Sequence, residues 1–365
     1  MIEALLKKKW SFADIQKYIG NYHSAYLSYS KDKGIRTYAA SGGTISSLLL
    51  CALEQHLIDG AVVCKTAVVD GSVRANFIIA KTKNDILSSQ GSKYVQTHFA
   101  KEAVPLIKLF EGKLAVVGLP CDISLTKRMS AKYPLFEKKI AFTIALICGH
   151  NSQPTLIDTI TTKLEQEAQS TLIDYKFRIG HWRGKIKADF KDGTSIEKKS
   201  LYFNLYHNLN YFSQKKCLYC FDHFGYNADI TAGDIWSYVL RKHPIKHSSI
   251  IVKTERGCKF FDKSVAADYI TAQPVQVSTI LDGQARIAPF HYNISARHRA
   301  GKLLGIAISD QLHEKVSWHE FIVALIILFN WKWSQNRKLA RLIFKLPKLF
   351  HIIYLYMLKG LESLK

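Results

Sequence analysis

Nearly continuous apolar runs alternate with amphipathic stretches through the first half of the chain. The segments at 61–69, 113–118 and 140–147 are such runs, which are typical of strands buried on both faces. The stretches at 44–57 and 154–169 have the spacing of helices that bury one face. This alternation predicts an α/β fold with a mainly parallel sheet covered by helices.

Two regions depart from that pattern. Residues 172–199 alternate between apolar and polar positions around an Asp192-Gly193 turn, which predicts an antiparallel β insertion. The chain after residue 285 is basic and predicts a helical extension. We therefore expect an N-terminal helix within residues 1–23, a catalytic domain at 24–284 and a basic helical C-terminal extension at 285–365.

Composition and charge narrow the class of protein. The 365 residues are 48% hydrophobic and 22% charged, as in a globular protein, and 51 Lys and Arg against 29 Asp and Glu give a net charge of +22. That excess predicts attraction to acidic lipid, nucleic acid or an acidic protein, without choosing among them. No apolar run is long enough to predict a transmembrane helix.

The C-terminal extension contains an unbroken apolar run from Phe321 to Phe329, flanked by tryptophans and followed by bases. Such a segment suits the interface of an anionic membrane, with the apolar side chains inserted and Lys and Arg at the headgroups. The alternative is a pair of helices packed on the catalytic body.

The cysteines suggest a metal or redox centre. There are seven, an odd number, and no secretory signal opens the chain, so a reduced cytoplasmic setting is expected. Cys217 and Cys220 form a C-x-x-C pair, while Cys121 and Cys148 each follow a predicted parallel strand, where ligands bind in such sheets. Four thiols could hold a [4Fe–4S] cluster or a zinc ion, although zinc sites more often use two close pairs. Cys258 is expected to pack in the core.

Two short glycine-containing turns are candidates for phosphate binding. S-G-G at 41–43 opens a predicted helix, and G-S-K-Y at 91–94 precedes another. Glycine lets backbone N–H groups approach an anion closely, and a helix N-terminus favours negative charge. A plain capped helix and a plain loop with an exposed lysine are the alternatives.

These two turns belong to a set of segments that occur in a specific order and spacing. The others are V-V-G-L-P-C-D-I (116–123), the strand ending at Cys148, C-L-Y-C-F-D (217–222) and A-D-I-T-A-G-D-I-W (228–236). Over roughly residues 20–270 that order resembles the coenzyme F420 hydrogenase/dehydrogenase beta-subunit family. That family includes flavin-containing iron–sulfur reductases, some of them bacterial and associated with surface-polysaccharide gene clusters.

The resemblance implies FAD beside a [4Fe–4S] cluster and an electron-transfer oxidoreductase that acts on an organic substrate or glycan precursor. It implies these cluster ligands: Cys121, Cys148, Cys217 and Cys220. It implies these flavin-site residues: Ser41, Gly42, Gly43, Gly91, Ser92, Lys93, Asp229, Gly233, Asp234 and Trp236. Lys93, His150 and Asp234 are the candidates for proton transfer during catalysis.

Two departures from the family affect the expected function. The chain lacks the N-terminal ferredoxin-like module of many relatives, so a separate ferredoxin or other electron-transfer protein is expected as the donor. It reads Cys148-Gly149-His150 where such relatives often read C-H-G. The expected location is cytoplasmic or peripheral on the inner face of the membrane.

Two other functions stay open from the sequence. The first is a non-enzymatic zinc protein attracted to nucleic acid, against which stands the lack of a nucleic-acid-binding motif. The second is a family member that has lost one of the two cofactors.

Overall fold

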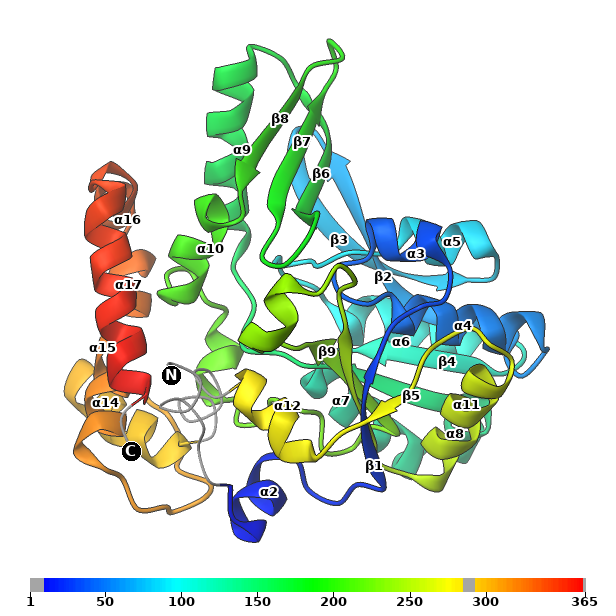
Figure 1. The fold of residues 1–365 in the computed structure, drawn as a ribbon. Helices are drawn as coiled ribbons and strands as arrows, with labels where there is room; N and C mark the ends of the chain where they lie inside the picture. The colour runs from blue at the N-terminus through cyan, green and yellow to red at the C-terminus, as the bar shows by residue number, and fades with distance from the viewer. Residues whose placement is uncertain (1–9, 285–292, 364–365) are drawn as a thin grey trace.

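A mixed β-sheet with helices on both faces forms the centre of the protein (Figure 1). The computed structural model describes residues 10–284 and 293–363. In this described part the main sheet has eight strands in the order β11-β1-β10-β9-β5-β4-β2-β3. Their bounds are β1 (Ser24–Ser28), β2 (Gly60–Val69), β3 (Ser72–Ala80), β4 (Leu114–Gly118), β5 (Ile140–Leu146), β9 (Ile230–Asp234), β10 (Ser248–Val252) and β11 (Gln273–Pro274).

The middle of this sheet is parallel and its edges are antiparallel. β2, β4, β5 and β9 pair in parallel, whereas β3, β10, β1 and β11 add to the two edges in antiparallel register. The apolar run of β4 is buried at every position, as expected for a strand covered on both faces. The predicted α/β class is therefore confirmed.

Helices of different segments cover the two faces of the sheet. Apolar side chains of one face pack against α3 (Lys33–Tyr38), α4 (Thr44–Glu54), α5 (Lys83–Ser88) and α11 (Glu255–Ala266). Those of the other face pack against α6 (Phe99–Leu109), α7 (Pro120–Lys132) and α8 (Pro134–Lys139), and near β1 against α2 (Phe12–Tyr18) and α12 (Val277–Gln284). The expected N-terminal helix corresponds in part to α2, and residues 1–9 lie outside the described residues.

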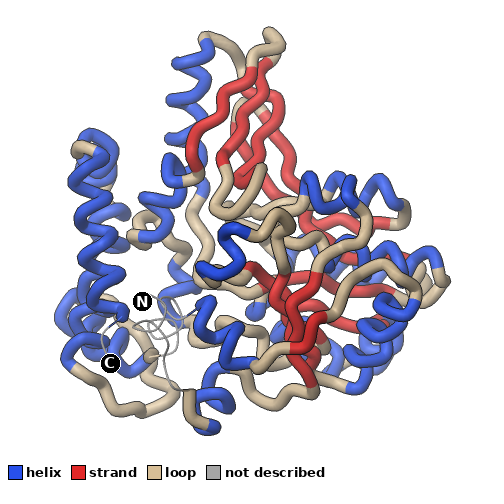
Figure 2. The backbone as a smooth tube through the Cα atoms, viewed as in Figure 1, coloured by secondary structure: helices blue, strands red, loops and turns tan. Residues whose placement is uncertain are grey.

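The predicted antiparallel insertion stands between β5 and β9 in the chain and projects from the main sheet (Figure 2). Its strands are β6 (Leu172–Ile179), β7 (Lys185–Phe190) and β8 (Ser195–Lys199), and helices α9 (Pro154–Ala168) and α10 (Leu201–Asn208) flank them. The predicted turn joins β7 to β8, with Gly193 at a φ of +87° that favours glycine. Short 3-10 helices, η1 (Lys215–Tyr219) and η2 (Tyr238–Lys242), lie on either side of β9 in the sequence.

The C-terminal extension is helical, as predicted. It contains α14 (Ile294–Leu304), α15 (Trp318–Gln335), α16 (Arg337–Lys345) and α17 (Lys348–Ser363), and the predicted boundary near residue 285 lies outside the described residues. The apolar run of α15 buries Val323 and Ile327 against the insertion, so this helix belongs to the core. The tryptophan-flanked run thus follows the packed alternative.

No helix among the described residues combines the length and the apolar character needed to cross a bilayer.

Candidate functional site

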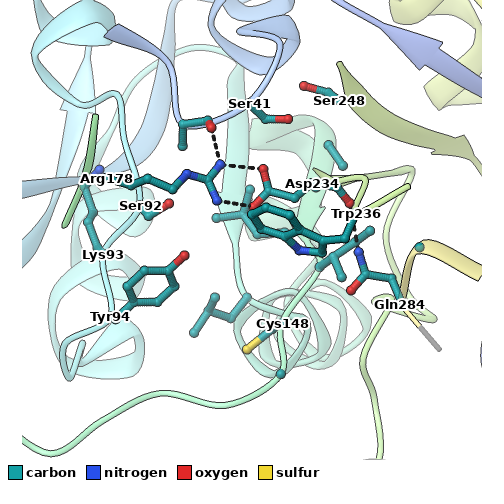
Figure 3. A pocket seen from close by; sticks show the side chains of 18 of the residues that line it. Ser41, Ser92, Lys93, Tyr94, Cys148, Arg178, Asp234, Trp236, Ser248 and Gln284 are labelled. Carbon is teal, nitrogen blue, oxygen red and sulfur yellow. Dashed lines mark hydrogen bonds and ion pairs between the residues drawn. The ribbon is translucent and has the colours of Figure 1, made fainter. Parts of the chain in front are cut away.

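A cavity of about 1220 Å³ lies at the carboxyl ends of the central parallel strands. Its wall combines the turn that precedes α4, the loop at 90–94, the ends of β4, β5 and β9, strand β6 of the insertion and helix α17. Figure 3 shows side chains from several of these segments around one space, among them Ser41, Ser92, Cys148, Arg178 and Asp234. Because this volume exceeds the roughly 300–1,000 Å³ of ordinary small-molecule pockets, it leaves room for a large cofactor and a substrate together.

Most of the predicted flavin-site residues line this cavity, whereas Gly42 and Asp229 do not. The predicted residues in the wall are Ser41, Gly43, Gly91, Ser92, Lys93, Cys148, His150, Gly233, Asp234 and Trp236. The structure therefore brings together the two glycine turns and the end of β9 with the residues that follow it, as the sequence order suggested.

The turn at 41–43 is held tightly against the end of the sheet. A side chain at Gly42 would place its Cβ 2.5 Å from the carbonyl oxygen of Ser28, and the Gly42 N–H donates to the Ser248 hydroxyl at 3.0 Å. Gly43 has a φ of +79° and stands immediately before α4. Gly42 therefore serves close packing, while Gly43 turns the chain so that the start of α4 faces the cavity.

The second turn uses its lysine differently from the sequence expectation. Lys93 donates from Nζ to the carbonyl oxygens of Ser89, Gln90 and Gly91 at 2.8, 3.2 and 2.9 Å. Burial lowers the pKa of Lys93 to about 8. Gly91 has a φ of +91°, and nothing lies within 4 Å of a Cβ placed there. The ammonium group thus closes the turn and leaves Gly91 open to the cavity.

A buried ion pair joins the insertion to the end of β9. Arg178 of β6 donates to both carboxylate oxygens of Asp234, at 2.5 and 2.7 Å, and also to the Ala40 carbonyl (Figure 3). Burial opposes the charge of Arg178, but the Asp234 carboxylate outweighs it and raises the pKa of the arginine. The guanidinium also lies 5.2 Å from the ring of Trp236, within cation–π range.

Sequence reasoning missed Arg178 because it treated β6 as an ordinary alternating strand. The sequence carried no signal for it, because Arg178 occupies a polar position in the regular alternation of Tyr175 to Ile179. Only the structure shows that Phe177 and Arg178 are buried in succession. Its bidentate contact fixes the Asp234 carboxylate at the cavity wall.

His150 lies deep in the cavity wall as a neutral imidazole. Its ring stacks on that of His207 at a centroid distance of 4.0 Å, and Nε2 donates to the His207 carbonyl oxygen at 2.9 Å. Burial lowers the pKa of His150 to about 4. The ring therefore presents a neutral, flat surface to the cavity at neutral pH.

Asp229 has a structural environment away from the cavity. Its carboxylate accepts hydrogen bonds from the N–H and hydroxyl of Thr143, both at 2.8 Å, from the Thr254 hydroxyl at 2.6 Å and from Arg256 Nε at 3.1 Å. These contacts tie β5, β9 and the start of α11 together. Asp229 thus affects the cavity only through the position of β9.

The four predicted cluster ligands gather in one region beside the cavity. Cys121 stands in the first turn of α7 after β4, Cys148 follows β5 and lines the cavity, and Cys217 and Cys220 flank the end of η1. A hydrogen bond joins two of these segments, since the Asn151 N–H, three residues after Cys148, donates to the Cys217 sulfur at 3.4 Å. The side chain of Cys121 is exposed, while the other three are half-buried.

The thiols also influence one another's protonation. Burial raises the pKa of Cys148, and the Cys217, Cys121 and Cys220 thiols raise it further. Burial likewise raises the pKa of Cys220 to about 11, with a contribution from Cys217. Within the described residues, however, no three Cys, His, Asp or Glu side chains converge as a ready metal site. The thiols thus share one region without forming a closed ligand set.

Arg297 of α14 supports the C-x-x-C segment from behind, a contact that sequence reasoning missed. It is fully buried and donates to the carbonyl oxygens of Cys217, Leu218 and Cys220 at 3.3, 3.0 and 2.6 Å. Burial lowers the pKa of Arg297 to about 10, against the opposing influence of the two thiols. In the sequence it stood in a basic stretch, and the small residues around it, Ala296 and Ala300, were the signal of a packed helix.

Sequence comparison identifies the class of protein. Residues 25–102 match the N-terminal part, and residues 111–278 the C-terminal part, of the family described as coenzyme F420 hydrogenase/dehydrogenase, beta subunit. The chain belongs to this family, which confirms the resemblance inferred from the motifs. The match ends before the C-terminal helices.

Individual relatives agree with this assignment. The chain is 26% identical over 268 residues to the coenzyme F420 hydrogenase subunit beta of Methanosarcina barkeri, covering 71% of this chain and 84% of the relative. It is 27% identical over 251 residues to the coenzyme F420-dependent sulfite reductase of Methanocaldococcus jannaschii, covering 65% of this chain and 36% of that protein. Both relatives carry the names of oxidoreductases.

A solved structure shares the fold. A chain in the xenon-derivatised F420-reducing [NiFe] hydrogenase complex from M. barkeri superposes with a TM-score of 0.61 at 22% identity, covering 80% of this chain and 98% of the other.

Proposed function

We propose that this protein is an iron–sulfur flavoprotein oxidoreductase that passes electrons from a one-electron donor to an organic substrate. The observation that carries the proposal is the gathering of four thiols from three separate segments beside a cavity large enough for a dinucleotide cofactor. When bound, a [4Fe–4S] cluster supplies single-electron transfer and FAD supplies two-electron chemistry.

The types of residue in this region suit an iron–sulfur cluster, although the four thiols do not form a closed ligand set here. Cys121, Cys148, Cys217 and Cys220 offer four soft sulfur ligands, which is the set that [4Fe–4S] clusters use. Arg297 fixes the backbone of the C-x-x-C pair, and the pKa of Lys216 is raised because the nearby thiols and Asp122 outweigh its burial. These cations favour the thiolate form that metal binding requires.

The cavity wall fits FAD in the same way. The start of α4 and the open turn at Gly91 offer backbone N–H groups to the anionic phosphates. Trp236 and the neutral His150 offer flat surfaces, and Arg178 holds the Asp234 carboxylate in place. The three predicted proton-transfer residues all line the cavity. Asp234 pairs with Arg178 and His150 stacks on His207, whereas Lys93 uses its three donors to close its own turn.

The electron donor would dock where the cluster ligands reach the surface. Cys121 is exposed, and the exposed Lys215 and Lys216 lie at the start of η1 beside it. A basic surface of this kind attracts an acidic electron carrier such as a ferredoxin. A reduced cytoplasmic setting, which keeps the seven free thiols available, completes this proposal.

The substrate is proposed as a small organic acceptor or a glycan precursor. The relatives' names make coenzyme F420 the first acceptor to assay, and a role in surface-polysaccharide biosynthesis rests on the resemblance to that bacterial branch alone.

Reduction of the bound flavin by reduced ferredoxin tests the proposed function. The wild-type protein, purified without oxygen, should show flavin bleaching, whereas Cys220→Ala should keep FAD but lose iron and rapid bleaching. The matched control is Cys258→Ala, which replaces a half-buried cysteine on α11 and should behave as wild type. If Cys220→Ala kept its iron and its rate, the assigned ligand set would be wrong.

A further inference from the structure

The last helix exposes apolar side chains along one complete face. In α17, Leu349, Phe350, Ile353, Tyr356 and Met357 are 66%, 47%, 54%, 65% and 64% exposed. Their spacing of i, i+1, i+4, i+7 and i+8 places them on one side of the helix. We call these five residues the apolar stripe. A contiguous exposed apolar surface of this kind marks an interaction site.

The stripe is not the face by which α17 packs on the protein. That face carries His351, Leu355, Leu358 and Glu362, which are at most 7% exposed. Leu355 and Leu358 join the hydrophobic cluster of the insertion and α15. The helix is therefore already anchored by its inner face, and the apolar stripe has a different role.

The charge around the stripe selects the partner. From Phe321 to Leu361 the chain has five Lys and two Arg and neither Asp nor Glu. On the neighbouring helix α16, Lys338, Arg341 and Lys345 are exposed together with the apolar Leu339 and Leu342. The acid of α17, Glu362, is only 6% exposed, lies on the inner face and pairs with Lys359 at 2.6 Å. Exposed apolar side chains beside exposed bases match a membrane surface that carries anionic lipid.

We propose that α16 and α17 dock this protein on an anionic membrane surface, with the apolar stripe inserted among the acyl chains and the bases of α16 at the headgroups. Tyr356 belongs both to the stripe and to the cavity wall. Docking therefore places the α17 side of the cavity at the lipid surface. The proposal is independent of the redox assignment, because it needs neither cofactor.

Vesicle flotation of the full chain tests the proposal. Vesicles of phosphatidylcholine with phosphatidylglycerol should carry the protein, those of phosphatidylcholine alone should not, and added salt should release it. The Leu349→Gln/Ile353→Gln/Met357→Gln variant should lose binding. Its matched control, Leu109→Gln/Leu135→Gln, removes apolar side chains that are 83% and 74% exposed on α6 and α8 and should bind as wild type.

A second variant pair isolates the charge. Lys338→Gln/Arg341→Gln/Lys345→Gln should weaken binding by about 100-fold, because each base near an anionic surface contributes roughly fivefold. Its control removes the same charge elsewhere, at three exposed lysines: Lys83→Gln/Lys101→Gln/Lys127→Gln.

Three results would overturn the proposal. One is no binding to anionic vesicles, and another is equal binding by either variant and its control. The third is that the wild-type protein forms an oligomer without lipid, does not bind vesicles, and becomes monomeric when the stripe is substituted. That result would assign the apolar stripe to a protein partner.

Discussion

The buried pair between Arg178 and Asp234 offers a quantitative test of how the insertion is held on the cavity. We consider Asp234→Asn, which keeps the size of the side chain and removes its charge. Arg178 would stay buried, with a side chain only 3% exposed, and would face a neutral amide in place of two charge-assisted hydrogen bonds. The Asp234 side chain is 25% exposed, so water offers only partial compensation.

The expected loss follows from that imbalance. Removing one partner of a buried ion pair destabilises a protein by about 3–5 kcal/mol. Because Asp234 is partly exposed, we expect Asp234→Asn to cost about 3 kcal/mol, the lower end of that range. With a urea m-value of about 3 kcal/mol per molar, the unfolding midpoint should fall by about 1 M. Because Arg178→Met removes the buried charge itself, the double variant should be less destabilised than the sum of the two single variants.

Urea unfolding followed by circular dichroism measures this loss, and Glu197→Gln is the matched control. Glu197 pairs with Lys185 on the same insertion at 2.8 Å, but the two side chains are 39% and 58% exposed. Breaking this surface pair should change stability by less than about 1 kcal/mol. If Asp234→Asn lowered the midpoint no more than Glu197→Gln, the pair would not hold the insertion in place.

Three further predictions address single residues. Gly42→Ala should destabilise the protein by about 1–3 kcal/mol in urea unfolding, because its Cβ would meet the Ser28 carbonyl; an unchanged midpoint would refute that close packing. Asp229→Asn should lose about 3 kcal/mol of stability yet bind FAD at wild-type stoichiometry, measured by the flavin content of the folded fraction. A selective loss of flavin would instead indicate that Asp229 contributes directly to flavin binding. The pKa of His150 falls from 6.5 to about 4 on folding, so the neutral ring costs no stability above pH 6.5 and increasingly destabilises the fold as the pH drops toward 4. His150→Gln should therefore reduce the loss of unfolding free energy between pH 7 and pH 5 by about 1–2 kcal/mol. An unaltered pH profile of stability would contradict the burial of His150 as a neutral ring.

The sequence predicted the elements whose signal is local. Continuous apolar runs identified β4 and β5 because a strand covered on both faces needs apolar side chains at successive positions. The Asp192-Gly193 turn identified the hairpin because glycine accepts the left-handed φ that the turn requires. Cys121 and Cys148 could be assigned to one edge of the sheet because the strands before them are parallel.

Long-range polar contacts were beyond sequence reasoning. Arg178 and Asp234 stand 56 positions apart, and Arg297 stands 80 positions from Cys217, so no local pattern joins them. The apolar run of α15 misled for a related reason, because a helix packed against an insertion on one side and α14 on another is apolar around much of its circumference. The apolar stripe of α17 has a composition similar to that of the α15 run. Only the burial of their side chains in the structure distinguishes the packed run from the exposed stripe.

The metal, sulfide and flavin content of the anaerobically purified protein tests the central assignment most directly. Bound [4Fe–4S] and FAD would give about four iron atoms, about four acid-labile sulfides and about one FAD per chain, and the iron should be lost from a variant in which Cys148 is alanine. A colourless protein with about one zinc ion and no flavin would contradict the account.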